Sequence, residues 1–365
     1  MIQILQVIII IAVILLLLYL GLLLYKIYSK NITKIKTPTG ISSLEEITLG
    51  DLKQWIFIRS TNQKNPILLF VHGGPGSPLL GMSSSRKYDK ELIKHFTVVH
   101  WDQRGAGKSY NRKIPIESIN LESYVKDCIE LIDYLCRRFS TPKVFLVGHS
   151  GGTLIGIKTA YRYPDKILAY VGVSQIINDY EQNRIAYEFI VKEAEKSGES
   201  KRLAAIKKIG PPPFESPMTF NKIGSQIGHY GGFLGNNSFK QKLKMVLLMF
   251  NFVTSPEYSL KEGFRSFIAR DYFFTTNALW EEMQAVDITT EIQSINVPIY
   301  FFEGKYDMTT PTVLVEKFYD NLEAKKGKNL IIFENSGHLP MFEENELYQD
   351  ILINIVLKDI EKFND

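Results

Sequence analysis

The chain contains little cysteine and carries little net charge. Its 365 residues include two cysteines, and the formal net charge is +4. Cys128 and Cys136 lie in a segment expected to be a single helix, which separates them by about 12 Å, too far for a disulfide. The sequence therefore excludes the disulfide framework that stabilises many small secreted domains.

Signals for nucleic acid, nucleotide and metal binding are also missing. No basic stripe interleaved with aromatic residues occurs, and no group of histidine, cysteine and carboxylate residues has metal-ligand spacing. The stretch GAGKS at 105–109 resembles the end of a phosphate-binding loop, but Asp102 stands where that pattern requires its first glycine. We therefore expect no cofactor, no metal and no nucleic-acid partner.

Charge is absent from the N-terminal segment. Residues 2–25 are almost entirely apolar and, as a helix, are long enough to cross the hydrocarbon core of a bilayer. A cleaved signal peptide, the alternative, needs basic residues before the apolar run and a small-residue cleavage site after it. Here the basic residues follow the run, at Lys26, Lys30, Lys34 and Lys36. We expect an uncleaved single-pass anchor in the cell membrane over residues 2–25, with the catalytic portion on the cytoplasmic side because of these lysines.

The remainder, after an expected linker over residues 26–43, alternates between strand and helix signals. Continuous apolar runs predict strands buried on both faces of a mostly parallel sheet; they lie at 67–71, 97–101, 143–147, 168–173, 298–302 and 330–333, after two first strands at 47–49 and 55–58. Helical patterns occupy 121–139, with Asn120 as N-cap, then 152–163 and 343–363. This alternation predicts a doubly wound α/β fold.

The alternation stops over residues 175–290. Helix-like pieces at 180–197, 239–252 and 277–286 flank a Pro/Gly-rich passage, and no strand signal appears. A stretch of this length is too long for a loop, so we expect an inserted helical cap. The core would then consist of two parts, residues 44–174 and 291–365.

The stretch LVGHSGG places Ser150 between Gly148 and Gly152 in the pattern G-x-S-x-G. It follows a predicted strand and precedes a predicted helix, which is the context of a nucleophile elbow. A serine in such a turn adopts an unfavourable backbone conformation that exposes its hydroxyl, and the glycines let the strand and helix approach closely. The alternative is a tight turn with an idle serine.

A serine nucleophile requires an oriented base, which in this order of elements should follow an acid. Among the six histidines, His338 alone lies after the serine and directly behind a predicted strand. Asp307 lies behind the preceding predicted strand and is the first candidate for the acid; Asp179 is the second and Asp287 the third.

Stabilisation of the oxyanion requires two backbone N–H groups. Gly151, directly after the serine, should supply one. The glycine-rich stretch HGGPG at 72–76 follows an early strand, and the N–H of Gly74 is the expected second donor.

These motifs together resemble the α/β-hydrolase superfamily, and within it the proline iminopeptidase-like group of serine aminopeptidases. The matching stretches are HGGPG (72–76), WDQRGAGKS (101–109), GHSGG (148–152), GKYD (304–307) and SGH (336–338), which span nearly everything after the apolar segment. The resemblance implies an α/β-hydrolase fold with a helical cap, no cofactor, and a Ser150–Asp307–His338 triad. It also implies loops that support the site without reacting, formed by His72, Gly73, Pro75, Gly76, Asp102, Gln103, Arg104 and Gly105.

The chain departs from this group in two places. Many members have tryptophan directly after the serine, whereas this chain has Gly151, which predicts a changed and wider acyl site. Members also bind the free amine of the substrate with cap carboxylates, for which Glu181, Glu188, Glu281 and Glu282 are available here.

The sequence thus predicts a membrane-anchored serine hydrolase that cleaves a small amide or short peptide, in the manner of a proline iminopeptidase. A lipase-like esterase acting on membrane-derived substrates is the first alternative, indicated by the anchor and by cap aromatics such as Phe214, Phe220, Tyr230 and Phe233. A non-catalytic ligand-binding protein on the same fold is the second.

Overall fold

The computed structural model describes residues 2–81, 86, 88–235 and 238–364. In this part of the chain, one sheet of eight strands runs through the molecule in the order β1-β2-β4-β3-β5-β6-β8-β10. The strands are β1 (Ile41–Leu49), β2 (Leu52–Ser60), β3 (Ile67–Val71), β4 (Thr97–Asp102), β5 (Val144–His149), β6 (Ile167–Val173), β8 (Ile299–Gly304) and β10 (Lys328–Phe333). The pairs β1–β2 and β2–β4 are antiparallel, and all other pairs are parallel.

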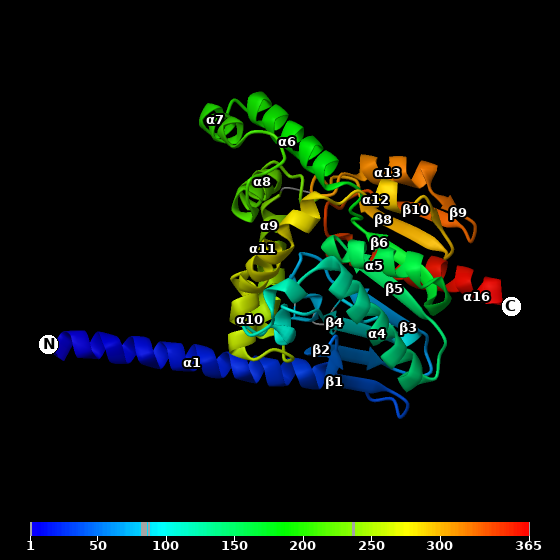
Figure 1. Cartoon of the computed structure of the whole chain (residues 1–365). Coiled ribbons are helices and arrows are strands. Elements are labelled where there is room, and N and C mark those ends of the chain that lie inside the picture. The colour runs from blue at the N-terminus through cyan, green and yellow to red at the C-terminus, as the bar shows by residue number, and fades with distance from the viewer. Residues whose placement is uncertain (1, 82–85, 87, 236–237, 365) are drawn as a thin grey trace.

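Helices cover both faces of this sheet, as the continuous apolar strands predict (Figure 1). One hydrophobic cluster joins the sheet to α4 (Leu121–Phe139), α5 (Gly151–Arg162) and α13 (Thr312–Asn321). A second cluster joins the other face to α3 (Leu92–His95), α14 (Pro340–Glu343) and α15 (Asn345–Ile351). Asn120 caps α4 by accepting from the backbone N–H of Ser123, as expected. The C-terminal helix expected over 343–363 runs without a break over residues 345–364 and contains a π-helical segment (Leu352–Leu357) between α15 and α16 (Lys358–Asn364).

The longer elements between β6 and β8 are all helices. They are α6 (Asp179–Lys196), α7 (Ser200–Ile209), α8 (Pro217–His229), α9 (Phe239–Thr254), α10 (Leu260–Phe267) and α11 (Arg270–Gln284). The short helix α12 (Ile288–Glu291) follows the cap helices. A separate two-stranded sheet consists of β7 (Ser294–Ile295), before β8, and β9 (Glu323–Ala324), after it.

Three of these cap helices were not expected from the sequence: α7, α8 and α10. Two of them carry recognisable start signals. Ser216 caps α8 directly before Pro217, and Ser259 forms a capping box with Glu262 at the start of α10. These polar caps would have identified the helices where apolar periodicity did not.

The N-terminal helix α1 (Ile2–Ile32) projects from the body of the molecule (Figure 1). Among the described residues it is the one helix long and apolar enough to cross a membrane, and its most apolar stretch of 18 residues has a mean hydropathy of 3.4. The linker expected over residues 26–43 is shorter than predicted. Lys26 continues the helix and donates to the carbonyl of Tyr258 at 2.7 Å, and β1 already begins at Ile41 because it pairs with Ser60 of β2. The connection is therefore confined to residues 33–40.

Candidate active site

Ser150 lies on the sharp turn between β5 and α5. Its backbone angles, φ 50° and ψ −124°, are unfavourable for a residue with a side chain. The flanking glycines make this turn possible. A Cβ at Gly148 would lie 2.8 Å from the carbonyl oxygen of Gly152, and one at Gly152 would collide with that of Val71. The turn has the backbone geometry of the nucleophile elbow that the sequence predicts.

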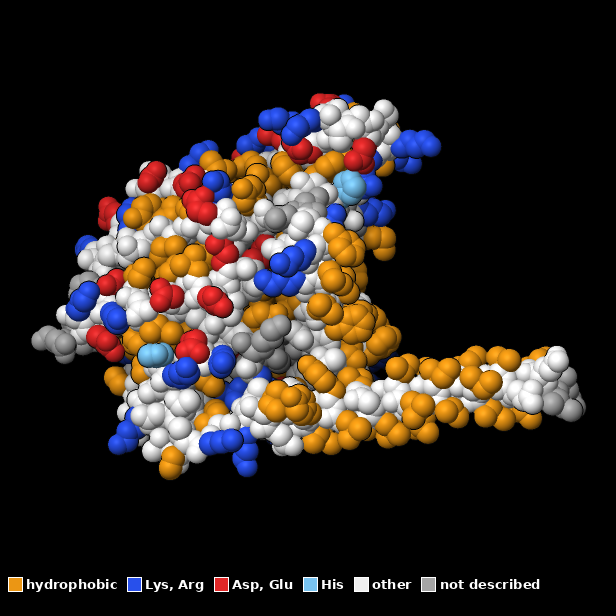
Figure 2. Space-filling view, turned by 180° about the vertical axis from the view of Figure 1, so that it is seen from behind, with side chains coloured by type: hydrophobic (Ala, Val, Ile, Leu, Met, Phe, Trp, Pro, Cys, Tyr) orange, Lys and Arg blue, Asp and Glu red, His pale blue; other side chains and the backbone are white. Residues whose placement is uncertain are grey.

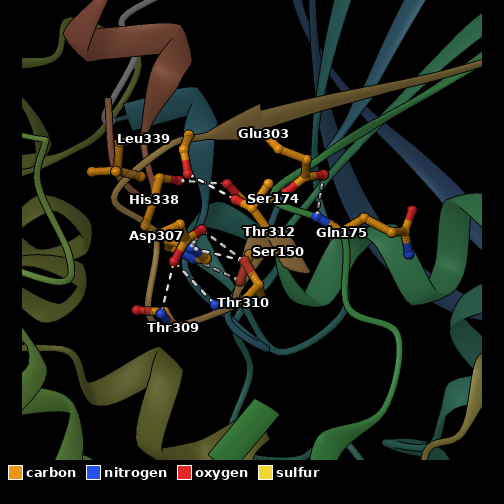
Figure 3. A network of polar contacts seen from close by, with 12 residues as sticks. Ser150, Ser174, Gln175, Glu303, Asp307, Thr309, Thr310, Thr312, His338 and Leu339 are labelled. Atoms are coloured by element: carbon orange, nitrogen blue, oxygen red, sulfur yellow. Dashed lines mark hydrogen bonds and ion pairs between the residues drawn. The ribbon is translucent and has the colours of Figure 1, made fainter. Parts of the chain in front are cut away.

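His338 and Asp307 reach this serine from loops at the ends of two later strands. The Nε2 of His338 lies 3.0 Å from the Oγ of Ser150, and its Nδ1 lies 2.7 Å from the Oδ2 of Asp307. Figure 3 shows the three side chains directed toward one another. Asp307 lies behind β8 and His338 behind β10, so the two side chains come from the ends of adjacent parallel strands.

The carboxylate of Asp307 is held by its own loop. Its Oδ1 accepts from the backbone N–H groups of Thr309 at 2.7 Å and Thr310 at 3.0 Å, and its Oδ2 accepts from the Thr310 hydroxyl at 2.7 Å. Burial raises the pKa of Asp307, but the charge of His338 and the hydrogen bonds outweigh burial, so the net pKa is lowered. The group is therefore an ionised acceptor that favours a proton on Nδ1 of His338. The roles of Thr309 and Thr310 were not predicted from the sequence, although an aspartate side chain in such a turn commonly accepts a hydrogen bond from the backbone N–H two residues ahead.

The other two acid candidates lie elsewhere. Asp179 begins α6 and accepts from the side chains of Gln182 and Asn183, and burial raises its pKa to about 7. Asp287 caps α12 by accepting from the N–H of Thr289 at 3.0 Å. In the described part of the chain, Asp307 is the carboxylate that pairs with His338.

The backbone of His338 is also fixed. Its carbonyl accepts from Nε2 of His149 and from the hydroxyl of Ser174, both at 3.1 Å. Burial lowers the pKa of His149 to about 3, so this ring is neutral and carries its proton on Nε2. From the cap, Phe233 places its ring 5.4 Å from that of His338 and accepts from the His338 N–H. His149, Ser174 and Phe233 were not singled out as contacts of the histidine from the sequence.

The HGGPG loop lies directly against the elbow. A Cβ at Gly73 would stand 2.9 Å from the Cβ of Ser150, and one at Gly151 would stand 2.7 Å from the carbonyl oxygen and 3.4 Å from the nitrogen of Gly74. The space where a side chain at position 151 would begin is thus filled by the Gly74 backbone. A wider acyl site beside Gly151 stays a prediction.

The two supporting loops are joined through His72 and Gln103. The N–H of Gln103 donates to Nε2 of His72 at 3.2 Å, so the proton of this ring lies on Nδ1, which donates to the carbonyl of Gly73 at 2.9 Å. The Gln103 side chain donates to the His72 carbonyl at 2.9 Å. Burial lowers the pKa of His72 to about 4, consistent with a neutral ring in a structural role.

The loop after β4, which begins at Asp102, is held from two sides. Arg104 forms a buried bidentate pair with Asp127 of α4, with both N–O distances at 2.6 Å. Asp102 accepts from the hydroxyl of Tyr258 at 2.7 Å, which ties this loop to the cap. Gly76 and Gly105 adopt positive φ angles of 77° and 79°, which favour glycine.

Three of the four cap glutamates have polar partners of their own. Glu181 and Glu188 pair with Arg184, and Glu282 accepts from the N–H of Leu121. Glu281 is exposed on α11. Among the described residues, none of the four forms a hydrogen bond or ion pair with the Ser150, Asp307 or His338 side chains, and no group of three or more potential metal ligands occurs.

A sequence profile of the family described as "alpha/beta hydrolase fold" matches residues 66–198. The "Probable aminopeptidase YbaC" of Bacillus subtilis is 34% identical over 320 residues, which cover 87% of this chain and 97% of that protein. A "Proline iminopeptidase" of Saccharolobus solfataricus is 24% identical over 302 residues, covering 79% and 84% of the two chains.

Solved structures show the same fold at low sequence identity. A proline iminopeptidase of Mycobacterium smegmatis matches with a TM-score of 0.61 and 15% identity, covering 88% of this chain and 99% of that one. A membrane phospholipase A matches with a TM-score of 0.60 and 16% identity, covering 96% and 98%.

Proposed function

This chain belongs to the proline iminopeptidase-like group of the α/β-hydrolase superfamily and is a serine hydrolase, and from this premise we propose that it releases an N-terminal residue from short peptides or small amides. The proposed triad is Ser150, Asp307 and His338. The observation that carries it is the continuous chain of contacts, 3.0 Å from Ser150 Oγ to His338 and 2.7 Å from His338 to Asp307.

In the proposed mechanism, Nε2 of His338 takes the proton of Ser150 as Oγ attacks the carbonyl carbon of the substrate. Asp307 keeps the other ring proton on Nδ1 and stabilises the imidazolium that forms. The N–H groups of Gly74 and Gly151 hold the oxyanion. His338 then protonates the leaving amine, and an acyl-enzyme remains on Ser150. Water activated by the same histidine releases the acyl group.

The test is the Ser150→Ala variant. Turnover of aminoacyl amides should fall by at least roughly a thousandfold, because the covalent route is lost while the fold is unchanged. Labelling by a fluorophosphonate probe should also be lost. Ser197→Ala, an exposed serine at the end of α6, is the matched control and should retain both properties. Activity of Ser150→Ala within about tenfold of the wild type would refute the triad, and failure of the wild type to label would favour the non-catalytic alternative.

We further propose that α1 anchors the enzyme in the cell membrane as a single transmembrane span. Its length, its apolar composition and the lysines that follow the span support this, and the lysines favour a cytoplasmic catalytic portion. In this arrangement the catalytic core comprises residues 41–174 and 291–365, and residues 175–290 form the cap.

A second candidate activity is hydrolysis of membrane-derived esters. Two observations favour it. The apolar helix α1 could place the enzyme at a membrane, and the fold of a membrane phospholipase A matches 96% of this chain. Comparing kcat/KM for aminoacyl amides with that for acyl esters, with Ser150→Ala as the blank for each, separates the two activities.

A further inference from the structure

The free length of α1 fixes where a bilayer would meet the rest of the protein. Residues 3–21 of this helix are exposed along their whole length, and Leu22 and Leu23 are the first to be partly covered. These 19 residues span roughly 28 Å, close to the ~30 Å hydrocarbon thickness of a bilayer. The span therefore ends where the body begins, without a spacer, and the surface around this point must lie at the level of the lipid headgroups.

The cap helices at this point expose a continuous set of apolar side chains. The apolar side chains on the outer side of α9 are exposed, with Phe239 at 81% and Leu247 at 59%. On α10, Phe264 is 58% exposed. We call this surface the α9–α10 face; it comprises Phe239, Leu243, Val246, Leu247, Phe250, Phe264 and Ile268. Figure 2 shows hydrophobic side chains gathered along the edge of the body from which α1 projects.

Helix α9 carries apolar side chains on two separate sides. With about 3.6 residues per turn, Leu243, Val246 and Phe250 share one side of the helix. Leu248 and Phe252 on another side are buried in the protein. The inner side therefore accounts for the packing of α9, and the outer side is left for a partner.

Positive charge borders this face. Lys240 and Lys242 are exposed at the start of α9, and Lys30 is exposed near the end of α1, which contacts α9. Lysines beside an apolar face can extend their charged ends to anionic lipid headgroups while their methylene groups remain in the interface. The aromatic side chains of Tyr25 and Tyr28, exposed on α1, belong to the residue type enriched at this depth.

We propose that the α9–α10 face docks on an anionic lipid bilayer, as a second membrane contact beside α1, so that the cap lies on the membrane surface. The proposal rests on the proposed anchoring by α1. A second copy of the chain is the other occupant that such a face could take. The bilayer is favoured because the exposed length of α1 by itself brings this face to the headgroups.

The test uses the full chain in nanodiscs containing phosphatidylglycerol, with single cysteines that carry an environment-sensitive fluorophore. Leu247→Cys reports on the α9–α10 face, Leu15→Cys on α1, and Lys326→Cys, exposed in the turn after β9, is the control far from α1. The native cysteines, Cys128 and Cys136, are buried, and the unsubstituted chain gives the labelling blank. Lipids with shallow or deep spin labels serve as quenchers.

We expect shallow quenchers to reduce emission at position 247 at least twofold more than at position 326, and deep quenchers to act at position 15. Quenching at 15 with none at 247 overturns docking but leaves the anchor intact. No quenching at 15 overturns the anchor and docking together. Emission at 247 that is shifted to the blue but insensitive to quencher, with two chains per disc, assigns the face to a second copy instead.

Lipid charge provides the second measurement. Replacing phosphatidylglycerol by phosphatidylcholine should reduce quenching at position 247 at least about twofold and leave position 15 unchanged. Equal quenching at 247 in both lipids would overturn the assignment of the face to anionic headgroups.

Discussion

At the scale of single residues, Gly151, directly after Ser150, is constrained both by the local turn and by a tertiary contact. Gly151 follows the serine at the start of α5, and the Gly74 backbone occupies the space next to it. Both residues carry the N–H groups that we propose bind the oxyanion. A side chain at 151 would therefore displace one donor while leaving the triad in place.

The Gly151→Ala variant should lower kcat at least roughly tenfold with a smaller change in KM, because losing one oxyanion donor typically costs about 10²–10³ in kcat. The added Cβ would be 2.7 Å from the Gly74 carbonyl oxygen, and a backbone atom must move to relieve this contact. Steady-state kinetics and the rate of fluorophosphonate labelling measure the effect.

The matched control is Gly224→Ala on α8, where a Cβ meets nothing within 4 Å. It should keep wild-type kinetics and gain about 0.5–1 kcal/mol of stability. If Gly151→Ala shows the same kcat as this control, these two N–H groups do not bind the oxyanion as proposed.

At the scale of elements, the cap holds the loop that supports the site. Tyr258, which precedes α10, donates to Asp102, and Asp271 of α11 accepts from the N–H of Gly107 at 3.0 Å. Burial raises the pKa of Asp102 to about 7, although hydrogen bonds from Lys108 and Tyr258 oppose this shift. The same carboxyl has a pKa near 3.8 when exposed, so the loop that joins the core to the cap contains a group that titrates differently in the folded and unfolded chain.

This difference predicts how stability depends on pH. Because the pKa of Asp102 is raised in the folded protein, its contribution to the free energy of unfolding is fully present below about pH 4. The contribution is lost as the pH rises toward 7, by up to about 1.4 kcal/mol per pH unit. Asp102→Asn keeps the acceptor for Tyr258 but cannot ionise. The unfolding midpoint of the wild type should therefore fall relative to that of Asp102→Asn as the pH is raised from about 4 to 7.

Thermal unfolding of the full chain in detergent across this range measures the difference. Asp287→Asn, which replaces a carboxylate by an amide at the cap of α12, is the control for the chemical change itself, since asparagine also caps a helix. A constant difference between the wild type and Asp102→Asn would show that Asp102 does not titrate between pH 4 and 7.

At the scale of the whole molecule, α1 and the cap share one edge, and α9 also lines a small, mainly apolar pocket with Leu339, the residue after His338. The cap is thus placed between the edge from which α1 leaves and the loop that carries His338. If α1 spans the membrane as we propose, the lysines that follow it set the orientation of the protein in the cell.

If the lysines after the span lie inside the cell, a cysteine at position 326 should react with a membrane-impermeant maleimide only after the cells are permeabilised. Gln3→Cys, at the other end of α1, should react with the same maleimide in intact cells, without permeabilisation. Labelling of Lys326→Cys in intact cells would place the catalytic portion outside and contradict the proposed sidedness.

The sequence by itself determined the elements whose signals are local. The buried strands, the N-terminal apolar helix, the helix capped by Asn120 and the elbow at Ser150 follow from apolar runs, charge and glycine spacing. The order of Asp307 and His338 behind their strands also followed, because parallel strands bring their ends to one edge of a sheet.

Only the tertiary structure decided which distant groups meet. It brought Asp307 rather than Asp179 to His338, placed Phe233 of the cap against the His338 ring, and filled the space beside Gly151 with Gly74. It also left the outer side of α9 exposed beside α1. These outcomes depend on contacts between segments far apart in the chain, which apolar periodicity and local spacing do not encode.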